Sequence, residues 1–60
     1  MNKDELKQLM TEHGLTGREV ARICHVSENA VYRWRMGDRK MSPAHVALLK
    51  MRIDDEHQTA

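Results

Sequence analysis

The chain has 60 residues, a net charge of +1 and one cysteine, which leaves room for a single small domain with one core. The lone cysteine excludes an internal disulfide framework, no apolar run approaches the ~18 residues of a membrane span, and no apolar signal segment follows Met1. These features predict a cytoplasmic protein, and so small a body favours a binding module over an enzyme with a substrate cleft.

Charge is distributed unevenly along the chain. Residues 31–53 contain six Lys and Arg against Asp38 alone, a net charge of +5. Residues 1–30 carry −1, and the acidic end of the chain adds −3. A basic segment inside a nearly neutral chain is the pattern expected for a polyanionic partner, and a solvated surface is the alternative.

Capping residues and glycines predict the first two helices. Asn2 and Glu5 form a capping pair for the first helix, which is expected to end at Gly14. Thr16 and Glu19 form a second capping box, which opens a short helix.

A third helix is predicted from a cap at Ser27 to a stop at Gly37. After a polar, basic loop, Ser42 followed by Pro43 starts a fourth helix, which is expected to last until about Ile53.

This order of helices predicts an all-α fold, a compact four-helix domain over residues 1–53. Residues 54–60 are acidic and polar without apolar spacing, and a flexible tail is expected there. Nowhere does the alternating pattern typical of β-strands occur.

Two short helices joined by a turn of three or four residues are the helix-turn-helix pattern. The steep crossing of the two helices needs a small residue at their contact, and Ala21 stands at that position. Apolar residues are also required around this contact, and the sequence supplies Val20, Cys24, Val26, Val31 and Trp34.

The third predicted helix has two different faces. At ~100° per residue, Val31 and Trp34 fall on one stripe, which is expected to be buried. The opposite face carries Glu28, Asn29, Tyr32, Arg33 and Met36. Amide, guanidinium, phenol and carboxylate groups are the ones that read base edges in a major groove.

Residues 16–37 resemble the helix-turn-helix of the phage repressor and Cro (XRE-type) superfamily, above all in the run Val-Tyr-Arg-Trp-Arg-Met-Gly at residues 31–37. The resemblance covers roughly residues 3–53 and implies a lambda-repressor-like domain that binds duplex DNA. In size and style the chain is also similar to very small regulators encoded beside phage accessory genes such as anti-CRISPR operons.

The chain departs from this family's pattern in two places. His25 occupies a turn position that usually holds a left-handed glycine; histidine tolerates that conformation at modest strain, and a wider turn is the alternative. Many members also have a fifth helix that builds the dimer, and this sequence stops before one.

The resemblance and the helical pattern together predict Asn29 and Arg33 as the leading base-reading residues, pairing with adenine and guanine respectively. Phosphate neutralisation is the alternative for Arg33. Glu28 is expected either to accept a hydrogen bond from a cytosine amine or to stabilise the helix N-terminus. Tyr32 is expected to contact a thymine methyl group or a phosphate, and packing alone is the alternative. Ser27 is expected to cap the helix and, as a second role, to contact a base or a phosphate.

Phosphate contacts, which fix the register on DNA without reading sequence, are predicted for the start of the second helix and for the basic residues after the third. The predicted set is Thr16, Gly17, Arg18, Arg35, Arg39 and Lys40, with Ser42 as a further hydroxyl donor. A solvated side chain is the alternative for each cation.

Trp34 is expected in the core rather than stacked on single-stranded bases, and Cys24 is expected to be a small buried hydrophobic residue. The histidines show no spacing typical of metal ligands, and no catalytic triad can be nominated. We therefore expect no metal, cofactor, small-molecule ligand or catalytic residue.

The fourth predicted helix carries two apolar stripes. The core stripe consists of Val46, Leu49 and Ile53, and the second stripe consists of Ala44, Ala47, Leu48 and Met51. A helix with two apolar faces is normally buried on both. The second stripe therefore predicts a twofold homodimer, whose recognition helices enter successive major grooves about 34 Å apart.

The sequence thus predicts a sequence-specific regulator of transcription that binds double-stranded DNA. A repressor is favoured, bound as a homodimer to an inverted-repeat operator in a promoter, and its own phage or mobile-element operon is the first candidate target. The alternative is a helical protein-interaction module such as an antitoxin or adaptor, which would favour apolar anchors over Asn29 and Arg33 on the outward face.

Overall fold

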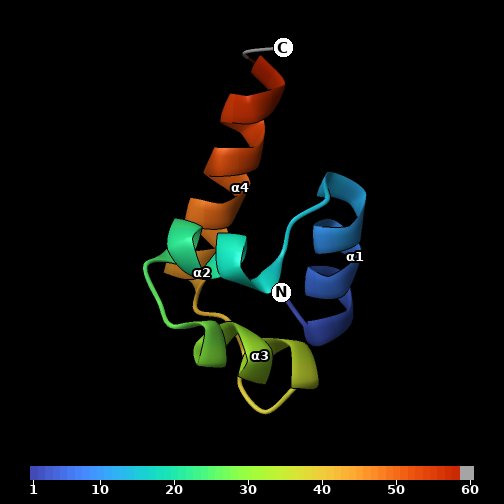
Figure 1. Ribbon diagram of the computed structural model, residues 1–60, viewed down its shortest axis with the longest axis vertical. Helices are drawn as coiled ribbons and strands as arrows, with labels where there is room; N and C mark the ends of the chain where they lie inside the picture. The colour runs from blue at the N-terminus through green and yellow to red at the C-terminus, as the bar shows by residue number, and fades with distance from the viewer. Residues whose placement is uncertain (59–60) are drawn as a thin grey trace.

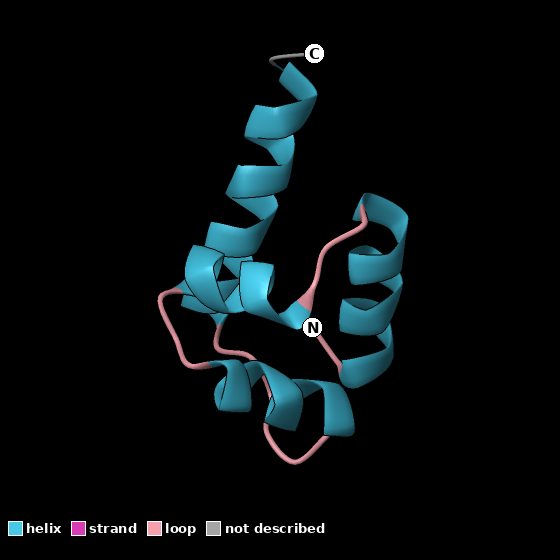
Figure 2. Cartoon of the chain, viewed as in Figure 1, coloured by secondary structure: helices cyan, strands magenta, loops and turns pink. Residues whose placement is uncertain are grey.

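The structure is a computed structural model that describes residues 1–58. Over these residues it contains four helices, α1 (Lys3–His13), α2 (Gly17–Cys24), α3 (Glu28–Met36) and α4 (Pro43–Gln58), and no strand (Figures 1 and 2). The molecule measures 35 × 20 × 19 Å, because the end of α4 projects beyond the other helices while α3 lies at the opposite end (Figure 1). The predicted all-α architecture with four helices is confirmed.

The fourth helix is longer than its apolar spacing predicts. It continues past Ile53 to Gln58, so residues 54–58 are helical where a flexible tail was expected. No glycine or proline follows Ile53 to stop the helix, and the loss of apolar spacing alone does not end one. Residues 59–60 of the expected tail lie outside the described residues.

The caps of the first two helices are confirmed. The Asn2 side chain accepts a hydrogen bond from the Glu5 amide at 2.8 Å, and the Glu5 carboxylate accepts one from the Asn2 amide at 3.3 Å. Thr16 and Glu19 form the same reciprocal pair at 3.1 and 3.3 Å. Each capping box satisfies amide groups that the first helical turn leaves without an intrahelical acceptor.

The later caps are confirmed as well. Ser27 accepts a hydrogen bond from the Ala30 amide at 3.2 Å, which fixes the first turn of α3. Ser42 accepts one from the His45 amide at 3.3 Å, and Pro43 occupies the first position of α4. Proline is favoured there because it has no amide hydrogen to leave unsatisfied.

The turn between α2 and α3 keeps the tight form, with three residues between the helices. His25 adopts a left-handed conformation with φ 59° and ψ 42°. Its amide donates to the Arg22 carbonyl at 3.3 Å, and the Val26 amide donates to the Ala21 carbonyl at 3.0 Å. Histidine thus takes a left-handed conformation that glycine adopts more readily, and the wider turn is not formed.

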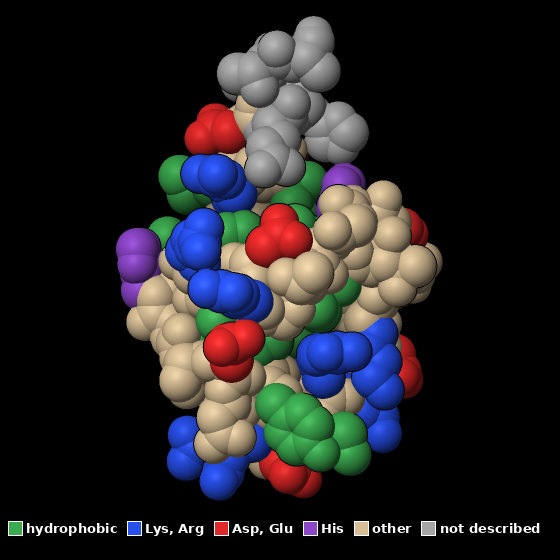
Figure 3. Space-filling model, in the orientation of Figure 1, with side chains coloured by type: hydrophobic (Ala, Val, Ile, Leu, Met, Phe, Trp, Pro, Cys, Tyr) green, Lys and Arg blue, Asp and Glu red, His purple; other side chains and the backbone are tan. Residues whose placement is uncertain are grey.

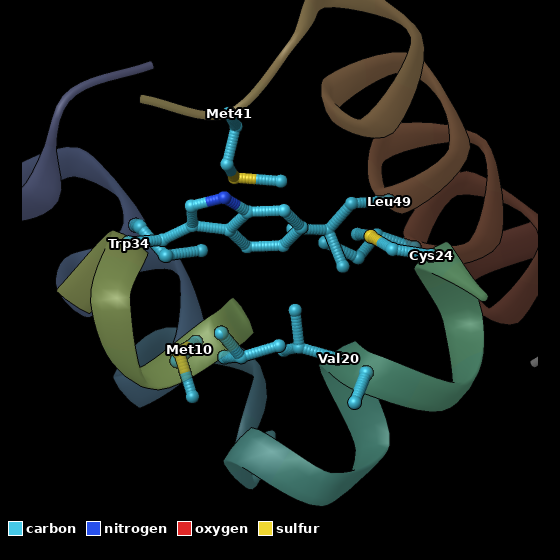
Figure 4. Close-up of a cluster of buried hydrophobic side chains, with 10 residues drawn as sticks. Met10, Val20, Cys24, Trp34, Met41 and Leu49 are labelled. Carbon is cyan, nitrogen blue, oxygen red and sulfur yellow. The ribbon is translucent and has the colours of Figure 1, made fainter. Parts of the chain in front are cut away.

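One apolar core holds the four helices together, and Trp34 extends across it. Its indole lies between Met41 on one side and Met10 and Val20 on the other (Figure 4). Trp34 is 6% exposed, which confirms its core position. The other buried residues are Leu6, Ala21, Cys24, Val31, Leu49 and Ile53. Burying one large apolar side chain contributes about 1.5–3 kcal/mol to folding.

Cys24 belongs to this core, as predicted. Its side chain is 2% exposed, and its Sγ lies 3.6 Å from the His45 carbonyl oxygen, to which the thiol donates. Burial raises the pKa of the Cys24 thiol, so the residue stays protonated and acts as a small hydrophobic side chain.

No helix within residues 1–58 is both long and apolar enough to cross a membrane.

The left-handed histidine gives a test of the turn. Replacing His25 by glycine should raise the free energy of unfolding by about 0.5–1 kcal/mol, because the relief of the left-handed strain exceeds the entropy that glycine adds to the unfolded chain. Urea unfolding at a fixed protein concentration measures the change.

Gly14→Ala is the matched control. Gly14 has φ 63°, and no atom outside its chain neighbours lies within 4 Å of a Cβ built on it, so the substitution tests backbone conformation alone. It should lower the free energy of unfolding by about 0.5–1 kcal/mol. A glycine at position 25 that destabilises the protein would contradict the assigned strain.

Candidate nucleic-acid interface

Helix α3 has one buried and one exposed face. Val31 is fully buried and Trp34 nearly so, and both point toward the core. The predicted base-reading residues are all exposed: Ser27, Glu28, Asn29, Tyr32 and Arg33. Helix α3 and the loop that follows it lie at one end of the molecule (Figure 1).

A basic depression of about 500 Å³ lies on one flank of α3, between that helix and the chain that leads into α4. Asn29 and Arg33 contribute to it from α3, and Arg39 and Lys40 contribute from the loop. Ser42 also lines it, and Ser27 lies at the start of α3. The fold therefore brings the two residues that are predicted to read bases beside two of the predicted phosphate-binding cations.

A second depression, of about 550 Å³, lies on the other flank of α3 where α1, α2 and α3 meet. Thr16 and Gly17 line it at the start of α2, together with Arg35 and Lys7. A Cβ built on Gly17 would lie 3.8 Å from Nη1 of Arg35, which places the guanidinium close to the N-terminus of α2. The positive end of the helix and two cations thus act on the same surface.

The two depressions leave the exposed face of α3 as a ridge between them. Figure 3 shows Lys and Arg side chains on both sides of an exposed hydrophobic patch at the α3 end of the molecule. A helix in a major groove has a phosphate backbone on each side, because the groove is about 12 Å wide and a helix with its side chains about 10–12 Å. A ridge with cations on both flanks matches that arrangement.

Three predicted site residues fall outside these depressions. Arg18 is exposed on α2, and Glu28 and Tyr32 are exposed on α3, but none of them lines either depression. Lys7 was not predicted from the sequence, and it lines the second depression from α1. It lies 28 positions from Arg35, and only the packing of α1 on α3 brings the two together, so no local sequence signal marks it.

The second stripe of α4 lies on the surface, as its pattern predicts. All four members are exposed, including Leu48 at 38% and Met51 at 64%. A shallow groove of about 390 Å³ between α2 and α4 joins these two side chains to Ile23 of α2. Arg22, Arg52 and Asp55 line the same groove, so charged side chains border these apolar ones. The dimer that this stripe predicts is not tested by a single chain.

Comparison of the chain with protein-family models, with curated proteins and with solved structures gave no match. The resemblance to the repressor and Cro family therefore stays a prediction from the motif. Among the residues that the structure describes, no group of three or more His, Cys, Asp or Glu side chains could hold a metal ion.

Proposed function

We propose that this protein is a sequence-specific regulator of transcription that binds double-stranded DNA with α3 in the major groove. The observation that carries the proposal is the exposed ridge of α3, which includes Asn29 and Arg33, between two basic depressions. Repression is the favoured mode in this proposal, because a protein bound across a promoter occludes polymerase from it.

Asn29 and Arg33 read sequence in this proposal. Both are exposed, and both line the depression beside the basic loop. An Asn side chain can pair with adenine through two hydrogen bonds, and an Arg side chain can pair with guanine in the same way. Each such pair is worth about 1–3 kcal/mol of discrimination against the wrong base.

Cations on the two flanks hold the two phosphate backbones. Arg39 and Lys40 serve one strand, and Arg35 and Lys7 serve the other, next to the amide groups at the start of α2. These contacts fix the position of α3 along the groove without reading bases. Binding is expected to weaken steeply with salt, because each neutralised phosphate releases condensed counterions.

The functional unit in this proposal is a homodimer formed through the second stripe of α4. Leu48 and Met51 supply apolar area, and the small side chains of Ala44 and Ala47 permit close approach of a second helix. A twofold pair presents two α3 helices to one face of the duplex about 34 Å apart, so the operator is an inverted repeat. The promoter region of the protein's own gene is the first candidate target.

Selection from a pool of random duplexes tests the function. The full chain is incubated with the pool at moderate salt, and the bound duplexes are amplified and sequenced over several rounds. An inverted repeat with adenine and guanine in each half-site is the expected result. Rounds of selection that enrich no sequence would contradict sequence-specific binding.

Substitutions should separate base reading from phosphate binding. Arg33→Ala should weaken binding to the selected duplex by about 1–3 kcal/mol per half-site and remove the preference at one base pair in each half-site. Arg39→Ala and Lys7→Ala should each weaken binding to all duplexes alike and reduce the magnitude of the slope of log K against log salt by about 2, because the dimer loses one phosphate contact in each half-site. Fluorescence anisotropy with a set of base-pair substitutions over several salt concentrations measures both effects.

Lys50→Ala is the matched control for charge, because Lys50 is exposed on α4 and lines neither depression beside α3. It should leave the preferred sequence and the salt slope unchanged. If Arg33→Ala and Arg39→Ala weakened every duplex equally, the assignment of Arg33 to base reading would be wrong.

The dimer gives a separate prediction. Leu48→Glu and Leu48→Lys should both yield monomers in light scattering, because each places a charge in the apolar contact, and both should bind the inverted repeat more weakly than the parent. The lysine variant controls for repulsion between glutamate and DNA. Retention of the dimer mass by both variants would contradict an interface at this stripe.

A further inference from the structure

Two large apolar side chains on α3 remain exposed without a packing role. Tyr32 is 56% exposed and Met36 is 54% exposed. Among the described residues the other exposed large apolar side chains are Leu48 and Met51, on the second stripe of α4. The molecule therefore has two separate exposed apolar surfaces, and only the one on α4 is accounted for by the proposed dimer.

Tyr32 and Met36 lie one helical turn apart on the ridge. Residues four apart share a helix face, and Asn29 lies on the same face three residues before Tyr32. The ridge thus presents an amide followed by two apolar side chains toward the α3 C-terminus. A Cβ built on Gly37 would lie 3.0 Å from the Lys3 Cδ, so a lysine of α1 packs beside this end of the ridge.

The surrounding charge decides what can cover these side chains. Cations stand on both flanks of the ridge, from Arg39 and Lys40 on one side and from Arg35 and Lys7 on the other. An apolar protein surface placed over the ridge would take water from these charges without replacing it, which costs free energy. A duplex supplies phosphates to both flanks and, between them, an apolar group in the groove floor: the 5-methyl group of thymine.

We propose, on the basis of the DNA-binding function above, that Tyr32 and Met36 recognise thymine methyl groups and that Met36 is a specificity-determining residue. Four helical residues span about 6 Å, and successive bases are about 3.4 Å apart along a strand. The two contacted methyl groups therefore lie one or two base steps apart in each half-site. The phenol ring of Tyr32 supplies a flat apolar face, and the flexible thioether of Met36 adapts to its methyl group.

The test replaces single thymines of the selected duplex by deoxyuridine, which keeps every hydrogen-bonding group and lacks only the methyl. At two positions in each half-site, replacing the thymine should weaken binding of the full chain about fourfold, which is the effect of one buried methyl group. Met36→Ala should remove this sensitivity at one position, and Tyr32→Ala should remove it at the other. Competition in an anisotropy assay measures each duplex and variant pair as a double-mutant cycle.

Two conservative variants keep the experiment specific. Met36→Leu keeps an apolar contact and should retain the sensitivity to deoxyuridine. Tyr32→Phe removes only the hydroxyl and should retain the sensitivity to deoxyuridine at the position assigned to Tyr32; loss of that sensitivity, with weaker binding to all duplexes, would show a phosphate contact of the hydroxyl and overturn the assignment of Tyr32. Both positions are exposed, so far-UV circular dichroism should report unchanged helix content.

The possible failures are distinguishable. If the parent chain binds its selected duplex with full affinity after every thymine replacement, methyl recognition is wrong while sequence-specific binding stands. A sensitivity that persists unchanged in Met36→Ala overturns the role of Met36. If selection enriches no duplex at all, the proposed function fails, and methyl recognition fails with it.

Discussion

The burial of Val31 and Trp34 fixes the rotation of α3 about its own axis, and the rest of the account depends on it. Both side chains enter the one core that this small chain can build, and Trp34 spans it between Met41 and Val20 (Figure 4). A rotation of one residue, about 100°, would carry Arg33 toward the core, where an unpaired charge costs several kcal/mol. The face of α3 that carries Arg33 therefore points toward solvent, because the face that carries Val31 and Trp34 is buried in the core.

Packing of the four helices around one core leaves two exposed surfaces that differ in their chemistry. At the α3 end, polar and apolar side chains form a ridge with cations on both flanks, which suits a groove between two phosphate backbones. Along α4, Leu48 and Met51 form an apolar strip next to Ile23, which suits a second copy of the chain. The left-handed conformation of His25 sets the short turn that joins α2 to α3. In the proposed function, reading DNA and pairing with a second copy therefore use two separate surfaces of the molecule.

Local rules predicted most of the fold, and tertiary packing accounts for what they missed. Neighbouring residues alone determine the caps at Thr16 and Ser27 and the buried stripe of α3. These features can therefore be predicted from the sequence. Lys7 joins the basic surface only through the packing of α1 on α3, which has no local signature. The extension of α4 to Gln58 has no signal in the apolar spacing, which ends at Ile53, and no glycine or proline after Ile53 stops the helix. The sequence is compatible with a tight or a wider turn at His25, and only the backbone conformation distinguishes the two.

The most direct test of the account is a titration of the 15N-labelled protein with duplex DNA at low salt, followed by backbone amide chemical shifts. Phosphate contacts do not depend on the base sequence, so a duplex of any sequence locates the phosphate-binding surface. The account predicts saturable shifts over residues 28–36, at the start of α2 and at Arg39 and Lys40, with little change along the outer face of α4. Shifts confined to α4, or no saturable shifts at all, would contradict it.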